Sequence, residues 1–133
     1  MILHCNFEEL RALAAASEAI VAGGYADAPV APQPDGVVMV EELLPRLTGD
    51  VSIETLPDQR RVQRAVRFIV GDLHRRLDER LIETHPADEE AVALYFDYGY
   101  TRTVLHRLDQ MGAEMEAIVD LIGGNAAAAV FPD

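Results

Sequence analysis

The residues best suited to bind a metal or move a proton are four scattered histidines, His4, His74, His85 and His106. None of the last three follows a glutamate by three residues, the spacing that sets two ligands of a di-iron bundle on one helix face. His74 and Asp78 are four residues apart and form a candidate ligand pair, but arginines on the same helix side oppose a cation. We therefore predict no metal site and no cofactor.

Candidate nucleophiles are scarce. Ser17 and Ser52 lack the flanking glycines of a nucleophile elbow. Cys5 directly follows His4, and neighbouring strand residues point to opposite faces, so these two do not make a catalytic pair. We expect Cys5, the only cysteine, to be a small buried apolar residue. Because the paired acids fall at or near expected helix starts, where the helix dipole accounts for them, we predict no catalytic residue.

A row of arginines is the first candidate binding surface. Its members, which are spaced to share one helix face, are Arg60, Arg64, Arg67 and Arg75. Between positions 60 and 80, seven arginines and three acids give a local charge of +4 in a chain of net charge −12. Guanidinium groups suit carboxylates and phosphates, so the row is a candidate site for a partner or an anion. The alternative is a solvated face paired with acids of a neighbouring helix.

An aromatic run over residues 95–100 is the second candidate surface. Helical spacing places Tyr95 and Tyr98 toward the core, and places Phe96 and Tyr100 on a different face. Aromatic residues beside an arginine are typical of interface anchors. The anchor candidates are Phe96, Tyr100 and Arg107. The alternative is that the strands or the first helix cover this face.

The same part of the chain could instead line a ligand pocket. Tyr95, Arg102 and His106 share one helix side and are the candidate lining residues. An aromatic ring, a guanidinium and an imidazole together suit a small molecule or an anion. This pocket is the basis of our alternative function.

The composition excludes several classes of partner. With 23 acidic and 11 basic residues the chain repels phosphates, so we expect no nucleic-acid and no membrane partner. No segment approaches the roughly 18 apolar residues of a membrane span. All basic residues are arginine, which removes lysine chemistry and fits a GC-rich bacterial genome. Residues 1–9 lack a secretory pattern, so we expect a cytoplasmic protein.

The N-terminal half predicts a small sheet with one helix. We expect strands over residues 1–5, 37–40 and 51–55, and a helix over residues 7–22 that begins at a capping box made by Asn6 and Glu9. Three prolines argue against regular structure over residues 25–36, which we predict to be a mobile surface loop. Residues 41–47 are expected to add one or two helical turns.

The C-terminal half predicts a helical hairpin. Apolar residues at helical spacing indicate one helix to about residue 83 and a second that ends at Gly123 and Gly124. The second helix repeats apolar residues at alternating steps of four and three, the seam of a helix packed along a neighbour. Residues 1–124 are then a single domain, and residues 125–133 a disordered tail. Because the small sheet cannot cover so long a hairpin, we predict a homodimer with a four-helix contact.

The fold class expected is therefore α+β and predominantly helical, with a two- or three-stranded sheet and a long antiparallel helical hairpin. The function that this organisation favours is a non-catalytic, acidic interaction or regulatory module that acts as a homodimer and binds an unidentified protein. A small-molecule or anion-binding protein is the alternative. An enzyme ranks third, because a histidine and carboxylates can act as acid and base without a sequence signature.

Overall fold

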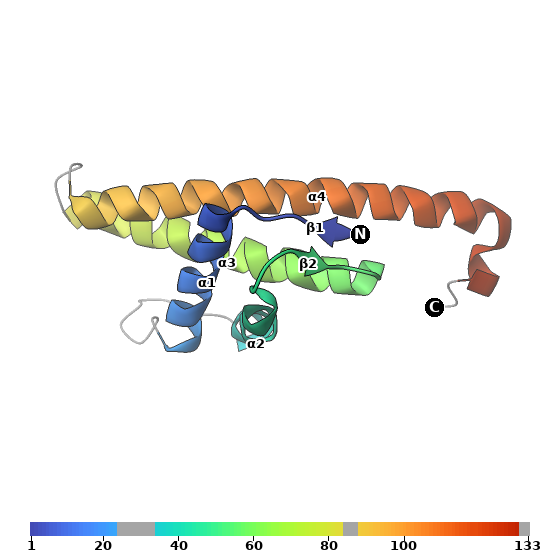
Figure 1. Cartoon of the computed structure of the whole chain (residues 1–133), viewed down its shortest axis with the longest axis horizontal. Coiled ribbons are helices and arrows are strands. Elements are labelled where there is room, and N and C mark those ends of the chain that lie inside the picture. The colour runs from blue at the N-terminus through green and yellow to red at the C-terminus, as the bar shows by residue number, and fades with distance from the viewer. Residues whose placement is uncertain (24–33, 84–87, 131–133) are drawn as a thin grey trace.

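The structure is a computed structural model, and it describes residues 1–23, 34–83 and 88–130. Two long helices, α3 (Leu56–Glu83) and α4 (Glu89–Val130), lie antiparallel along their length (Figure 1). The helices α1 (Phe7–Val21) and α2 (Pro34–Leu43), the short 3-10 helix η1 (Leu44–Arg46) and a two-stranded sheet gather on one side of this hairpin. The predicted class, a mostly helical α+β fold with a helical hairpin, is confirmed.

The sheet joins the start of the chain to its middle. Strand β1 (Ile2–Leu3) pairs antiparallel with β2 (Val51–Ser52), in the register that sets Leu3 opposite Val51. Leu3 and Val51 are buried, and so is Ile53 two residues further on, as period-two alternation predicts. The sheet thus fixes the chain just before α1 and just before α3.

Helix α1 begins where its capping signal predicts. The Asn6 side chain accepts a hydrogen bond from the Glu9 N–H at 2.8 Å, and the Glu9 side chain accepts one from the Asn6 N–H at 2.9 Å. This is the reciprocal capping box, which satisfies two otherwise unpaired backbone donors. Gly23 follows the helix at a φ of +84°, where a residue with a Cβ would be strained.

The core lies between the hairpin and the layer formed by α1, α2 and the sheet. Every element except η1 contributes at least one side chain that is almost fully buried. The largest of these are Leu13 and Ile20 of α1, Ile53 after β2, Ile69 of α3 and Leu108 of α4. One contiguous cluster therefore holds all the elements together.

Helices α3 and α4 approach each other closely around Gly112. The Gln59 side chain of α3 is fully buried and donates to the Leu108 carbonyl of α4 at 2.7 Å. A Cβ at position 112 would lie only 2.8 Å from Gln59 Nε2. A glycine is needed here because its missing side chain leaves room for the glutamine.

The predicted strand over residues 37–40 is wrong, because these residues belong to α2. The loop expected over residues 25–36 also ends earlier than predicted, since α2 begins at Pro34; residues 25–33 lie outside the described residues. A four-residue apolar run satisfies a strand and a helix equally. Here Val40 and Leu43, three residues apart, face the core together, and Pro34 and Asp35 are good first residues of a helix.

The predicted end of the last helix at Gly123 and Gly124 is also wrong. Helix α4 continues through both glycines to Val130. Each glycine costs a helix about 1 kcal/mol relative to alanine, but four alanines, the best helix formers, follow at positions 126–129. The helix therefore includes most of the segment that we expected to be a disordered tail.

Candidate functional site

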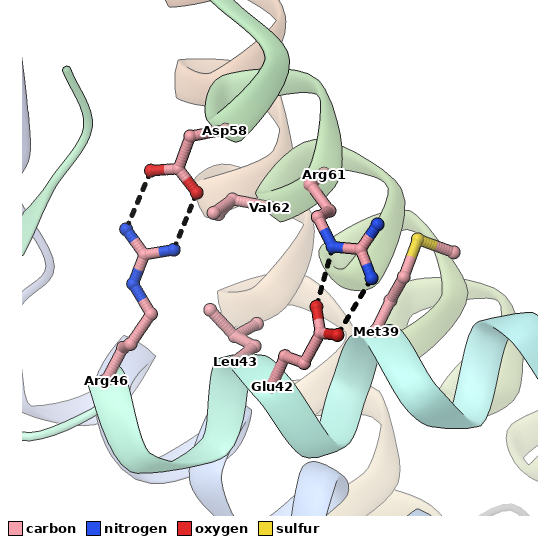
Figure 2. Close-up of a pocket in the computed structure, with 7 residues that line it drawn as sticks. All are labelled: Met39, Glu42, Leu43, Arg46, Asp58, Arg61 and Val62. Atoms are coloured by element: carbon pink, nitrogen blue, oxygen red, sulfur yellow. Dashed lines mark hydrogen bonds and ion pairs between the residues drawn. The ribbon is translucent and has the colours of Figure 1, made fainter. Parts of the chain in front are cut away.

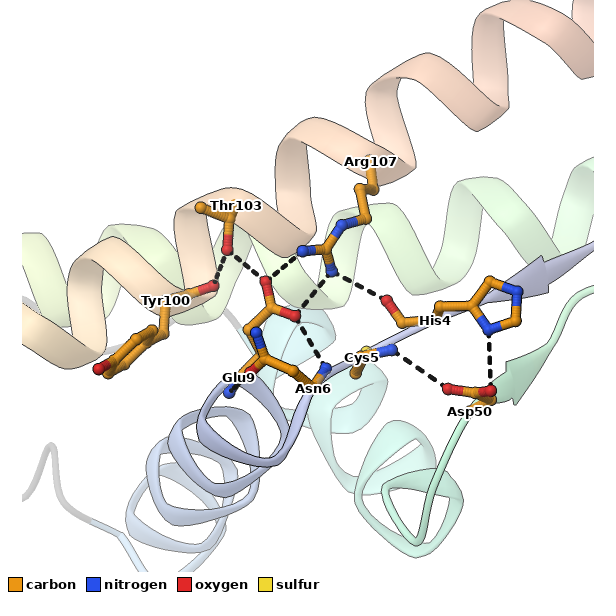
Figure 3. Close-up of polar contacts among 8 residues, drawn as sticks. All are labelled: His4, Cys5, Asn6, Glu9, Asp50, Tyr100, Thr103 and Arg107. Atoms are coloured by element: carbon orange, nitrogen blue, oxygen red, sulfur yellow. Dashed lines mark hydrogen bonds and ion pairs between the residues drawn. The ribbon is translucent and has the colours of Figure 1, made fainter.

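A polar cluster ties the start of α1 to the middle of α4 (Figure 3). Glu9 lies in the first turn of α1 with its side chain only 3% exposed. Arg107 of α4 donates from both terminal nitrogens to the two carboxylate oxygens, and Thr103 Oγ1 donates to Oε2 at 2.6 Å. Together with the Asn6 N–H, these donors fill the four acceptor positions of the carboxylate. We call Glu9, Thr103 and Arg107 the Glu9 clamp.

Two opposing effects act on the Glu9 carboxyl. Burial favours its neutral form, but the hydrogen bonds from Arg107, Thr103 and Asn6 together outweigh burial and hold its pKa below the usual value. The same pairing raises the pKa of Arg107. Glu9 is therefore ionised at neutral pH, with its oxygens fully engaged, and is arranged for structure rather than proton transfer.

The clamp also reaches the first strand. Arg107 Nη1 donates to the His4 carbonyl at 2.9 Å, while His4 Nδ1 lies 2.8 Å from Asp50 Oδ2 (Figure 3). The Cys5 N–H donates to the other Asp50 oxygen at 3.2 Å. These contacts connect β1, the start of α1 and the turn before β2. Sequence reasoning found Glu9 only as a helix cap and Arg107 only as an interface anchor.

Cys5 sits within this cluster, half-buried and packed against the core. Burial and the negative charge of Glu9 raise the pKa of its thiol to about 11, although the positive charge of Arg107 opposes the change. At pH 8 the thiol should react with iodoacetamide about a hundredfold more slowly than in the urea-unfolded chain, because the thiolate is the nucleophile. Mass spectrometry of the alkylated protein measures both rates. Similar rates in the folded and unfolded chain would contradict the assignment.

Most of the predicted arginine row is paired with acids. Arg60 Nη2 lies 3.4 Å from Glu116, and Arg67 Nη2 lies 3.2 Å from Asp109, both on α4. The remaining two members differ. Arg75 contacts Asp72 and Glu79 of its own helix, whereas Arg64 has no ion pair within the described ranges. The pairing with α4 is the alternative that the sequence left open, and anion binding stays a prediction.

Two bidentate ion pairs fix α2 and η1 against the first turns of α3 (Figure 2). Arg46 of η1 donates to both oxygens of Asp58, and Arg61 of α3 donates to both oxygens of Glu42, at 2.6–2.9 Å. The hollow between them is small, about 50 Å³. A second hollow of about 480 Å³ opens beside it. Its lining residues are Pro57, Asp58, Arg60, Arg61 and Arg64.

The anchor candidates on α4 separate into two environments. Arg107 is engaged in the Glu9 clamp, although its side chain stays 38% exposed. Phe96 remains 53% exposed and stacks on the half-buried Tyr100 with ring centroids 6.4 Å apart. Phe96 is thus the anchor candidate that stays accessible.

The ligand-pocket candidates all lie on the exposed side of α4. Arg102 and His106 are exposed, and Arg102 stands 5.8 Å from the centre of the Tyr98 ring. The prediction that Tyr95 belongs to the core is wrong, because its side chain is 63% exposed. Near the hairpin end α4 packs mainly on α3, so Tyr98 is half-buried there while Tyr95 is not. Both hollows described above are lined by other residues.

Large apolar side chains are exposed on both long helices near the end at which the hairpin is joined. Leu81 and Ile82 in the last turns of α3 are exposed, as are Val92, Tyr95 and Phe96 in the first turns of α4. The rings of Tyr95 and Phe96 meet edge to face at 5.9 Å. We call these five residues the tip patch. Its size was not predicted, because Tyr95 was expected to face the core.

The described residues hold no group of three or more side chains suited to a metal. His74 Nδ1 lies 3.5 Å from Asp78 Oδ2 on the exposed side of α3. Among the described residues, no helix has an apolar stretch long enough to cross a membrane. Comparison with protein-family models, curated proteins and solved structures finds no match to this chain.

Proposed function

We propose that this protein is an interaction module that binds another protein through the tip patch and acts as a homodimer through its hairpin. The tip patch is the single observation that carries the proposal. Five large apolar side chains, between 42% and 85% exposed, stand at one end of a helical hairpin. Monomeric soluble proteins rarely expose such clusters, and aromatic residues are enriched where partners bind.

The surroundings of the tip patch suit a protein partner. Its rings are large and have few rotatable bonds, so they lose little entropy when a partner orders them. The exposed acids Asp78 and Glu89 lie near the same end of the hairpin, and their negative charge favours a partner with basic residues at the rim of the contact. Arg80, which pairs with Asp88 and Glu90, holds the helix ends together beneath it.

A photo-crosslinking amino acid at position 96 tests the proposal in the native cell. We expect one adduct of defined mass, different from twice the mass of the chain, because the side chain would lie inside the contact. The matched control carries the same group at His106, which is also exposed on α4. Adding Ile82→Glu to the first variant should abolish the adduct. Equal adducts from both positions, or none from position 96, would overturn the proposal.

A further inference from the structure

Three arginines line the larger of the two hollows, at the start of α3. Pro57, Arg60, Arg61 and Arg64 follow the i, i+3, i+4, i+7 spacing of a single helix face, and all four line this hollow. Its volume of about 480 Å³ falls within the usual range of small-molecule sites, about 300–1,000 Å³. The hollow lies over the first turns of α3, where the helix dipole adds to the positive charge of the guanidinium groups.

Much of the hydrogen-bonding capacity of these three arginines is unused. Arg64 is exposed and makes no ion pair with any residue that the structure describes. Arg60 makes one long contact, from Nη2 to Glu116 at 3.4 Å. Arg61 donates from Nε and Nη2 to Glu42 at 2.6 and 2.8 Å, and its Nη1 takes no part in this pair. A guanidinium has five N–H donors, so each of the three can accept a further oxygen as its partner.

The acids beside the hollow are already paired. Both oxygens of Asp58 accept hydrogen bonds from Arg46, at 2.8 and 2.9 Å, and both oxygens of Glu42 accept from Arg61 (Figure 2). The pair with Glu42 also fixes the position of the Arg61 guanidinium. The charges of Asp58 and Glu42 are therefore compensated, whereas the charge of Arg64 is not compensated by any described residue.

We propose that this hollow binds the phosphate group of a small molecule, and we call it the phosphate hollow. Arginine forks hold carboxylates and phosphates through charge-assisted hydrogen bonds. A carboxylate has two oxygens in one plane and suits a single fork, whereas a phosphate has three acceptor oxygens around a tetrahedral atom and can accept from several forks at once. Three arginines on successive turns of one helix face therefore favour a phosphate. Pro57 supplies an apolar surface for the rest of the molecule.

The charge of the whole chain limits the ligand to a small one. With a net charge of −12, the surface as a whole repels an extended polyanion such as a nucleic acid. Exposed charges are largely screened beyond about 10 Å at 0.1 M salt, so a small anion in the phosphate hollow is affected mainly by the arginines that line it. This size limit distinguishes a bound metabolite from a macromolecule that tracks along the helix.

This inference goes beyond the proposed function and does not depend on it. The phosphate hollow lies at the start of α3, whereas the tip patch includes the last turns of that helix. Crosslinking at position 96 reports on the tip patch, and anion binding reports on the hollow. Either proposal can therefore fail alone.

Titration of the full chain with inorganic diphosphate, followed by ¹⁵N NMR at constant ionic strength, tests the site. We expect saturable shifts of the Nε–H signals of Arg60, Arg61 and Arg64. Arg64→Gln should weaken binding about tenfold, because one charge-assisted partner of the anion is lost. The melting temperature of this variant without the anion should equal that of the wild type, since Arg64 has no ion pair to lose.

The matched control is Arg67→Gln, which removes the same charge from an exposed side chain of α3 that does not line the hollow. It should change the affinity by less than about twofold, because its charge is more distant and is screened. Equal losses in Arg64→Gln and Arg67→Gln, or shifts that do not saturate, would overturn the site. Citrate, which carries carboxylates alone, should bind about fivefold more weakly than diphosphate. Citrate that binds as tightly would overturn the choice of phosphate.

Discussion

Replacing Arg107 by alanine should lower the free energy of unfolding by about 1–3 kcal/mol, because the Glu9 carboxylate loses two charge-assisted hydrogen bonds. The Arg107 side chain is itself 38% exposed, so water can replace part of what is lost. Thr103 and the Asn6 N–H would remain, but neither carries a positive charge. Urea titration followed by circular dichroism measures the change.

Arg102→Ala is the matched control for this prediction. Arg102 lies on the same helix and is exposed. Its one contact among the described residues is a cation–π contact that is worth about 0.5–1 kcal/mol at such a site. The double variant Glu9→Gln with Arg107→Met should be more stable than Arg107→Ala, since no buried charge is then left unpaired. If Arg102→Ala and Arg107→Ala have equal effects, the clamp does not stabilise the fold.

The difference between wild type and Arg107→Ala should also shrink as the pH falls. In the wild type the pKa of Glu9 is below its unfolded value of 4.5, so its stabilising effect is complete above pH 4.5 and is lost as the pH falls through the folded pKa. In the variant, burial is no longer outweighed and should raise the pKa of Glu9, so protonation relieves the buried charge. Urea titrations of the wild type and Arg107→Ala at pH 7 and at pH 3 give the difference in unfolding free energy at each pH.

Gly112→Val should destabilise the protein by about 2–6 kcal/mol. The added side chain would meet the Gln59 amide, and overpacking in a core typically costs about 1–3 kcal/mol. If Gln59 is displaced, its hydrogen bond to the Leu108 carbonyl is lost and a buried amide is left unsatisfied, at a further cost of about 1–3 kcal/mol. The melting temperature and the urea midpoint report the loss.

Gly99 supplies the control, because nothing lies within 4 Å of a Cβ built there and it stands on the same helix. Gly99→Ala should stabilise the protein by up to about 1 kcal/mol through helix propensity, while Gly112→Ala should gain nothing. Combining Gln59→Ala with Gly112→Val should recover part of the lost stability, since the Gln59 side chain then no longer occupies the space that the valine needs. Equal effects of alanine at the two glycines would contradict the close packing of α3 on α4.

A local signal in the sequence predicted the start of α1. The capping box of Asn6 and Glu9 is formed by residues within one helical turn, so no tertiary contact is needed to recognise it. The same locality explains the failure at residues 37–40. Four apolar residues do not distinguish a strand from a helix, and only the contacts of Val40 and Leu43 with the core decide the matter.

The candidate site was harder to predict because its contacts are long-range. Glu9 and Arg107 each stood out in the sequence, but no periodicity pairs residues that are 98 positions apart. The prediction that Tyr95 is buried in the core was wrong for a related reason. Helical spacing gives the face on which a side chain lies, yet whether that face is covered depends on how far α1 extends along α4.

The Glu9 clamp also sets an order of events during synthesis. The N-terminal helix leaves the ribosome long before Arg107 is made, and at about 5–20 residues per second its carboxylate waits on the order of 5–20 s for its partner. Until then α1 has its capping box but lacks the contact that fixes it on α4. The nascent chain therefore completes the docking of α1 on α4 only after most of the hairpin has been translated.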